Sequence, residues 1–286
     1  PAIEEALRCA PESASALTLR ARLYEQRGRL EAMRGLDPQA SFSAAIADCD
    51  HALKVDPNFL NAYFQRGLTL GCRAEIDATK RRPYRAAFEA AIADLDEAIR
   101  RDPSFVQAYL MRARVHNQWG MAKAADGRHA VDSFENAVSD AARALELEPG
   151  HISAYVTRGE AYWNLGVLAF SRHADPRDFY RKALEDLDLA LAKNPDYIPA
   201  LQCRGKVHSR VGEAQDAHGE DPHDSYERAI ADYGEVVPLD PRSPGAHFNR
   251  GIAYARLGKA EAKRGTDSGR SYELALADFD RTLERN

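Results

Sequence analysis

The sequence predicts an all-α solenoid, in which helical hairpins stack and each repeat buries its apolar face against its neighbours. Three residue columns carry this prediction, because each recurs six times at a spacing of 46 residues. Proline recurs at Pro11, Pro57, Pro103, Pro149, Pro195 and Pro241. Arginine recurs at Arg20, Arg66, Arg112, Arg158, Arg204 and Arg250. Aspartate recurs at Asp48, Asp94, Asp140, Asp186, Asp232 and Asp278. A constant spacing indicates that one structural unit is repeated along the chain.

Composition excludes several classes of protein. A chain of 286 residues ordinarily suggests two globular domains, but the repeat predicts a single array over residues 1–286. The net charge of -5 argues against a nucleic-acid-binding surface, which should be basic. The sequence has no apolar run near the roughly 20 residues of a membrane span. Four cysteines without metal-like or paired spacing predict reduced thiols in a cytoplasmic protein: Cys9, Cys49, Cys72 and Cys203.

The period also divides the chain into its elements. Ala6 and Leu7 stand one period before Ala52 and Leu53, so residues 1–12 are expected to be the second helix of a preceding repeat. Six repeats are then expected at about 14–59, 60–105, 106–151, 152–197, 198–243 and 244–286. The chain lacks an initial Met and stops at Asn286, one residue before the next proline of the series. We therefore expect a segment of a longer protein.

The first helix of each repeat is expected to span about 21 residues. In the repeat 60–105 it begins near Leu60 and carries Ala62, Tyr63, Arg66 and Gly67. A later glycine column predicts the left-handed turn that ends this helix: Gly35, Gly127, Gly219 and Gly265. Asp-Pro pairs at 37–38, 175–176 and 221–222 then predict a capping Asp followed by Pro at the first position of the next helix.

The second helix is expected to span about 18 residues and shows the clearer amphipathic face. That face starts with an aromatic column: Phe42, Phe88, Phe134, Tyr180, Tyr226 and Tyr272. Three residues later comes an alanine column: Ala45, Ala91, Ala137, Ala183, Ala229 and Ala275. A small residue kept beside an aromatic one predicts close contact between helix backbones. Asp-Pro pairs at 56–57, 102–103 and 240–241 are expected to end this helix.

The residue columns resemble those of a known repeat family. A 46-residue period suits HEAT repeats by length, whereas a tetratricopeptide unit has about 34 residues. The order of aromatic, small and large residues nevertheless follows the tetratricopeptide pattern at Tyr63, Gly67, Leu70, Ala74, Phe88, Ala91, Leu95, Ala98 and Pro103. The chain thus resembles a tetratricopeptide array whose two helices are prolonged at their shared hairpin, between Ala74 and Phe88. This resemblance implies a right-handed α-solenoid that binds a protein or peptide.

The arginine and aspartate columns could suggest catalysis, but six copies of each favour a structural ion pair between the first helix and a neighbouring second helix. Asp94 and Asp96 point about 200° apart on a helix, so they are not expected to converge on one ligand. The nine histidines, including His218 and His223 in one loop, are expected to be exposed, without a metal site. Neither a phosphate loop nor a Ser/His/Asp motif is present, so we expect no enzyme and no cofactor.

The resemblance also implies where a partner binds, because tetratricopeptide superhelices use the concave face formed by their first helices. The fifth position of that helix reads Thr18, Phe64, Leu110, Val156, Gln202 and Phe248. The ninth reads Arg22, Leu68, Arg114, Glu160, Lys206 and Ile252, and the twelfth includes Asn117 and Trp163. The candidate contact residues are Phe64, Leu68, Leu110, Arg114, Asn117, Val156, Glu160, Trp163, Gln202, Lys206 and Phe248. The alternative is that Phe64, Leu110 and Val156 pack inside the stack.

The sequence therefore predicts a non-catalytic scaffold that binds a protein or peptide, as one module of a larger protein. A receptor for chaperone tails is not expected, since only Asn249 matches the column that holds the peptide carboxylate in that subfamily. A structural alternative is a spacer that stacks end to end through Leu276, Phe279 and Leu283. Binding of single-stranded RNA is a third, less favoured hypothesis, because the chain is acidic.

Overall fold

The computed structural model describes residues 2–241 and 244–284, and all regular secondary structure within them is α-helical. The chain divides into two compact units, Pro1–Pro149 and Gly150–Asn286, each of which is described by itself. The expectations for the chain start, for Asn286 and for the junction near 243 fall at least partly outside the described residues. The single array over residues 1–286 and its division into repeats stay predictions.

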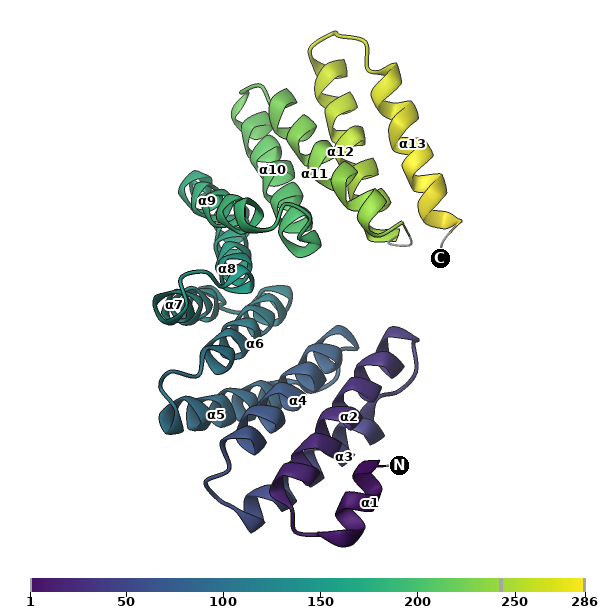
Figure 1. The fold of residues 1–286 in the computed structure, drawn as a ribbon. Helices are drawn as coiled ribbons and strands as arrows, with labels where there is room; N and C mark the ends of the chain where they lie inside the picture. Colours follow the sequence, from purple (N-terminus) through teal and green to yellow (C-terminus); the bar gives the residue numbers. More distant parts are fainter. Residues whose placement is uncertain (1, 242–243, 285–286) are drawn as a thin grey trace. The chain divides into compact units, whose positions relative to one another are not determined.

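Unit 1 contains helical hairpins that pack on one another (Figure 1). Its helices are α1 (Ala2–Cys9), α2 (Ala14–Met33), α3 (Gln39–Val55), α4 (Leu60–Thr79), α5 (Arg85–Arg101), α6 (Val106–Ala125) and α7 (Val131–Leu147). The helices α2, α4 and α6 each pack on the helix that follows, and α2 also contacts α4, as α4 contacts α6. The first helices of this unit therefore form a layer of their own.

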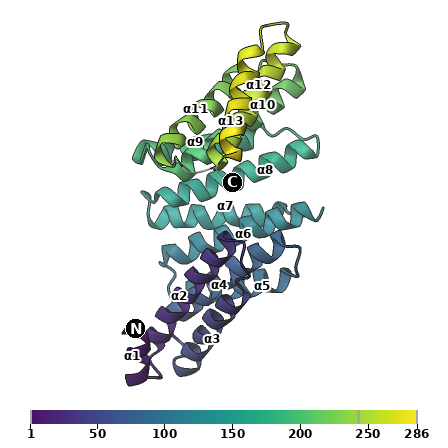
Figure 2. The same cartoon turned by 90° about the vertical axis from the view of Figure 1, so that its right-hand side faces the viewer.

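Unit 2 repeats the same arrangement, with its hairpins layered on one another (Figure 2). Its helices are α8 (Ile152–Ser171), α9 (Arg177–Lys193), α10 (Ile198–His218), α11 (His223–Leu239), α12 (Pro244–Lys263) and α13 (Gly269–Leu283). First helices of 20 or 21 residues and second helices of mostly 17 confirm the expected lengths to within a residue. The all-α class, with packed antiparallel helix hairpins, is thus confirmed.

The hairpin turns confirm the glycine column and correct the capping prediction. Gly35, Gly127, Gly219 and Gly265 all have φ between 68° and 78°, and Arg81 and His173 take the same left-handed conformation in the remaining repeats. The prolines of the Asp-Pro pairs at 37–38, 175–176 and 221–222 occupy the N-cap, not the first helical position. The Asp175 side chain accepts the backbone N–H of Arg177 at 3.0 Å, because an Asp two residues upstream reaches that donor in an Asx turn.

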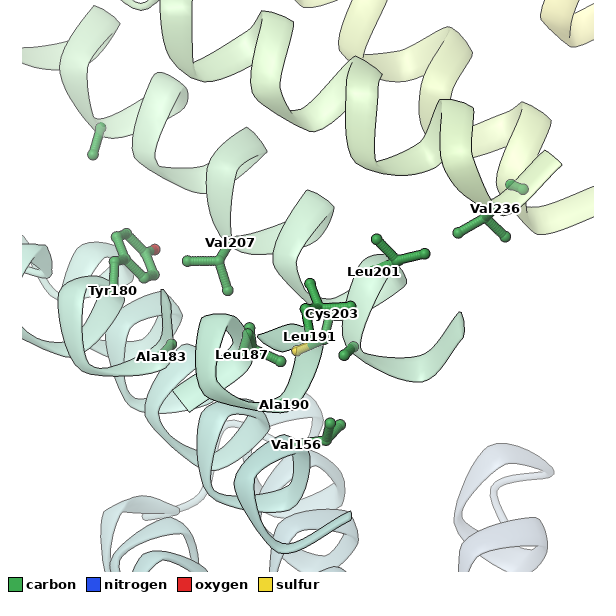
Figure 3. Close-up of a cluster of buried hydrophobic side chains, with 13 residues drawn as sticks. Val156, Tyr180, Ala183, Leu187, Ala190, Leu191, Leu201, Cys203, Val207 and Val236 are labelled. Carbon is green, nitrogen blue, oxygen red and sulfur yellow. The ribbon is translucent and has the colours of Figure 1, made fainter. Parts of the chain in front are cut away.

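Close backbone contact is confirmed where the aromatic column meets the first helix. A Cβ atom placed on Gly120 would lie 2.5 Å from the Phe134 ring, and one on Gly212 would lie 2.7 Å from the Tyr226 ring. The six alanines of the alanine column are 0–3% exposed. In unit 2, one continuous cluster joins the helices from Val156 to Val236 (Figure 3). Glycine and alanine thus let the hairpins close tightly on their aromatic rings.

The arginine and aspartate columns pair in all six repeats. Each arginine donates Nε and Nη2 to the aspartate of its own hairpin partner, as Arg158 does to Asp186 at 2.8 and 2.6 Å. The six pairs are Arg20–Asp48, Arg66–Asp94, Arg112–Asp140, Arg158–Asp186, Arg204–Asp232 and Arg250–Asp278. The hydrogen bonds to Asp94 raise the pKa of the Arg66 guanidinium, which therefore stays charged. The columns are structural, as expected.

A second carboxylate ties some of these arginines to the preceding hairpin. Nη1 of Arg66 lies 2.5 Å from Asp50, Nη1 of Arg112 contacts Asp96, and Nη1 of Arg204 lies 2.7 Å from Asp188. Aspartates two residues apart, such as Asp94 and Asp96, therefore bind different arginines. This confirms that they do not converge on one ligand.

The expectation that the histidines are exposed is wrong for His116 and His247, which are 8% and 3% exposed. His247 Nδ1 lies 3.1 Å from Asp278, so the ring replaces an aromatic residue while joining the ion pair. Burial first, then the charges of Arg204 and Arg228, lower the pKa of His208 to about 4. The Asp232 carboxylate is 4.0 Å from His208 but is already bonded by Arg204.

Candidate functional site

A groove of about 590 Å³ lies on the first-helix layer of unit 1. We call it the unit 1 groove; it is lined by α2, by α4, and by residues at the starts of α4 and α6. It contains two of the predicted contact residues, Phe64 and Leu68, and two further members of their columns, Thr18 and Arg22. The fifth and ninth helical positions thus face one depression here.

Aromatic rings form the apolar part of the unit 1 groove. The Phe64 and Phe105 rings lie 5.0 Å apart at an angle of 57°, and Phe59 lines the same depression. Phe64 also packs against the buried cluster around Phe88. Its ring is therefore held by the core and presents the rest of its surface to the groove.

The unit 1 groove has cationic walls over a buried carboxylate. Arg22 and Arg29 are exposed on α2, while Glu25 between them is only 3% exposed. Glu25 accepts the Cys72 thiol at 3.6 Å, and Arg29 lies 3.7 Å away. Burial raises the pKa of Glu25, and the nearby arginines and the thiol offset that only in part. The groove surface is therefore mainly cationic.

The first helices of unit 2 carry six more of the predicted residues: Val156, Glu160, Trp163, Gln202, Lys206 and Phe248. Lys206 Nζ lies 5.6 Å from the centre of the Trp163 ring, a cation–π distance, and Glu160 and Gln202 are half-buried. Phe248 is 47% exposed, with its ring 6.0 Å from that of Phe279. The structure therefore brings Trp163 and Lys206 together.

Three predicted contact residues are buried instead of facing a partner. Leu110, Asn117 and Val156 are 6%, 5% and 5% exposed. The alternative of packing inside the stack therefore holds for Leu110 and Val156, and Val156 joins the main cluster of unit 2 (Figure 3). The physical reason is that side chains on this face of a first helix can contact either the neighbouring hairpin or the solvent. Arg114 remains exposed on α6, where its charge acts on Glu25.

Sequence reasoning missed the residues that precede the first helices. Phe59 and Phe105 line the unit 1 groove together with Asn61 and Gln107. Phe59, Phe105 and Tyr197 share one column of the repeat, so an aromatic residue just before the first helix was the available signal. Glu25 and Arg29 carried no comparable periodic signal.

Within the described part of the chain, one group of side chains has metal-ligand chemistry. The ligand atoms of His223, Asp224 and Glu227 lie within 4.8 Å of one another at the start of α11. The two carboxylates are exposed, and such groups are common without a metal. The absence of a metal site stays a prediction.

Among the described residues, none of the helices combines the length and apolar character needed to cross a membrane.

Comparison with known families now decides the repeat type. A family model described as "TPR repeat" matches residues 224–258, and one described as "Tetratricopeptide repeat" matches residues 84–125. These two segments of the chain match tetratricopeptide repeats. Tetratricopeptide repeats generally form protein-interaction modules and are typically non-catalytic. No curated protein sequence matches the chain.

The chain is similar in fold to two solved structures. The structure of PilW, a "widely conserved type IV pilus biogenesis factor", matches with a TM-score of 0.51 and 15% identity, over 93% of this chain and 94% of its own. The structure of TTC0263, a thermophilic TPR protein of Thermus thermophilus, matches with a TM-score of 0.50 and 20% identity, over 77% and 90%. At these identities the likeness concerns the fold.

Proposed function

We propose that this chain is a non-catalytic scaffold whose unit 1 groove binds an extended segment of a protein partner. The observation that carries this proposal is the groove of about 590 Å³ on the first-helix layer, with an aromatic floor and a polar rim. Tetratricopeptide repeats generally act as protein-interaction modules, which supports a protein over a small substrate.

The chemistry of the groove favours a particular kind of segment. Phe64, Phe105 and Leu68 offer apolar contact for an anchoring side chain. Exposed side-chain amides along the rim can pair with the backbone of a bound strand: Gln26, Asn61 and Gln107. Arg22 and Arg29 favour acidic residues beside the anchor. The proposed partner segment therefore combines an apolar anchor with acidic flanks.

Selection from a library of displayed peptides, with the intact chain as bait, tests this proposal. Leu19→Asp places a charge in the groove, and Leu23→Asp is its matched control on the same helix, because Leu19 and Leu23 are 48% and 50% exposed but only Leu19 lines the groove. Arg22→Glu and Arg27→Glu form a second matched pair, since Arg27 is exposed and pairs with Glu31 instead.

We expect the selected peptides to share an apolar residue with acidic neighbours. Leu19→Asp should weaken their binding by about 30-fold, as expected for loss of roughly 2 kcal/mol at an interface centre. Arg22→Glu should weaken it most at low salt. Equal affinities for each groove variant and its control would remove the unit 1 groove as the binding site.

End-to-end association is a second candidate, and it also has a specific observation behind it. Leu276 and Leu283 of α13 are 63% and 74% exposed, while Phe279 is half-buried. Sedimentation of the intact chain over a range of concentrations, beside a Leu276→Lys, Leu283→Lys variant, tests this candidate. A concentration-independent monomer would eliminate it.

We also propose a cytoplasmic location, supported by the four free cysteines.

A further inference from the structure

A second depression of about 240 Å³ lies on the first-helix layer of unit 1, between the C-terminal turns of α4 and α6. We call it the second pocket. It has an apolar part of alanines and one methionine, with a polar edge: Ala78, Met121, Ala122 and Ala125, then Glu75 and Gln118. Met121 is 52% exposed and Ala125 is also exposed, so the apolar surface is accessible from solvent.

The second pocket is formed by residues for which a shorter tetratricopeptide unit has no place. The excess of the 46-residue spacing over a unit of about 34 residues begins after Ala74 in α4 and after Gly120, one period later, in α6. Ala78, Met121 and Ala125 come from the helical turns that follow these two positions. The pocket therefore depends on the longer first helices of this chain.

Both depressions involve α4, which gives their separation. Leu68 lines the unit 1 groove and Glu75 lines the second pocket, two helical turns further along α4. At about 1.5 Å per residue, these positions are about 10 Å apart along the helix axis. An extended chain advances about 3.3 Å per residue, so side chains four residues apart are separated by about 13 Å. One short segment is therefore long enough to reach both depressions.

Two exposed arginines carry positive charge between the two depressions. Arg29 lines the unit 1 groove from α2, and Arg114 stands on α6, one turn before Gln118. The charges of both arginines act on Glu25 in the groove and on Glu75 in the second pocket. Burial raises the pKa of Glu75, and the two arginines offset that in part. Glu75 already accepts a hydrogen bond from Gln118 at 2.6 Å, so the arginines can also attract an acidic side chain of a partner.

We propose that the unit 1 groove and the second pocket together bind one extended segment of a protein partner, with two apolar side chains four residues apart and an acidic residue midway between them. This inference rests on the function proposed above. One apolar side chain enters the groove beside Phe64, and the other enters the second pocket beside Met121. Alternate side chains of an extended segment share a face, so the acidic side chain points to the same surface, toward Arg29 and Arg114.

The peptides selected from a random displayed library with the intact chain test the spacing directly. We expect them to share two apolar residues at positions i and i+4, with Asp or Glu at i+2. Peptides that share only one apolar residue would overturn the inference, even where Leu19→Asp weakens their binding and the proposed function therefore holds. A library without any binder would remove the proposed function and this inference together.

Ala125→Gln and Ala124→Gln locate the second apolar side chain of the selected peptide. Both alanines are exposed in the last turn of α6, but only Ala125 lines the second pocket. Gln is a good helix former, so both variants should fold. We expect Ala125→Gln to weaken binding by about fivefold and Ala124→Gln to leave it unchanged. A peptide whose second apolar residue is replaced by Ala should bind wild type and Ala125→Gln alike, because the contact is then already lost.

Equal affinities of the selected peptide for Ala125→Gln and Ala124→Gln would overturn the role of the second pocket. The proposed function would survive that result as long as Leu19→Asp still bound the peptide more weakly than its control Leu23→Asp. The two failures are therefore distinguishable with one peptide and four variants.

Replacement of the central acidic residue of the peptide by its amide tests the charge between the depressions. We expect binding to weaken by about fivefold at low salt, and by less at high salt, because the arginines are exposed. This loss should shrink in Arg114→Gln and persist in Arg27→Gln, since Arg27 is exposed on α2 and pairs with Glu31. An amide peptide that binds wild type as tightly as the acidic one would overturn the placement of the acidic residue.

Discussion

Removal of one arginine from the repeated ion pairs separates its electrostatic role from its packing role. Arg158 donates two hydrogen bonds to Asp186, whose side chain is 5% exposed, while its own side chain is 24% exposed. Both Arg158→Ala and Arg158→Met leave the Asp186 carboxylate without its guanidinium. Only Arg158→Met keeps an apolar stem between α8 and α9.

The magnitudes follow from these two losses. Leaving a buried charge without its partner costs about 3–5 kcal/mol. Arg158→Ala also removes about two buried methylene groups, at about 0.8 kcal/mol each. We therefore expect Arg158→Met to be more stable than Arg158→Ala by about 1–2 kcal/mol. The double variant Arg158→Met, Asp186→Leu removes the isolated charge and should recover most of the loss, because apolar pairs often replace buried ion pairs without cost.

Urea unfolding of the intact chain measures these differences. With a denaturant slope of about 3 kcal/mol per M, the midpoints of the two single variants should differ by about 0.5 M. Equal midpoints would refute the packing role of the arginine stem. A double variant no more stable than Arg158→Met would refute the claim that the isolated carboxylate causes the main loss.

Three further predictions concern single positions. Asp94→Asn should cost about 2–3 kcal/mol in urea melts, whereas Asp96→Asn should cost under about 1 kcal/mol, because the Asp94 and Asp96 side chains are 9% and 54% exposed; equal costs would contradict this. Gly219→Ala should destabilise by about 1 kcal/mol through its φ of 78°, and His173→Gly, at a φ of 58°, should stabilise; a neutral Gly219→Ala would count against backbone strain. The pKa of His208 is about 4 in the folded protein and higher in the unfolded chain, so the unfolded state takes up the proton first on acidification. Its contribution to stability is complete above about pH 6.5 and is lost as the pH falls to about 4, by up to about 3 kcal/mol. His208→Asn should flatten that part of the stability curve, and an unchanged slope would contradict the assignment.

Much of the fold could be predicted because the same residue types recur at the same positions of successive repeats. The turn glycine at Gly219 and the ion pair of Arg158 with Asp186 depend on local geometry that repeats with the same residue types. The finer capping geometry could not be predicted, because Pro176 fits both the N-cap and the first helical position by its fixed φ. The hydrogen bond that Asp175 accepts from the Arg177 N–H is compatible with both positions, and only the start of the helix at Arg177 places Pro176 at the N-cap.

The sequence by itself determined the helices, their order, the close-packed columns and the ion pairs, since each repeats in a register that local propensity and side-chain size explain. Only the tertiary structure decided which first-helix residues face the surface: Phe64 lines a groove, whereas Leu110 and Val156 are buried in the same column. The physical reason is that helical periodicity gives a side chain its direction, while its burial depends on the size and shape of residues on the neighbouring hairpin.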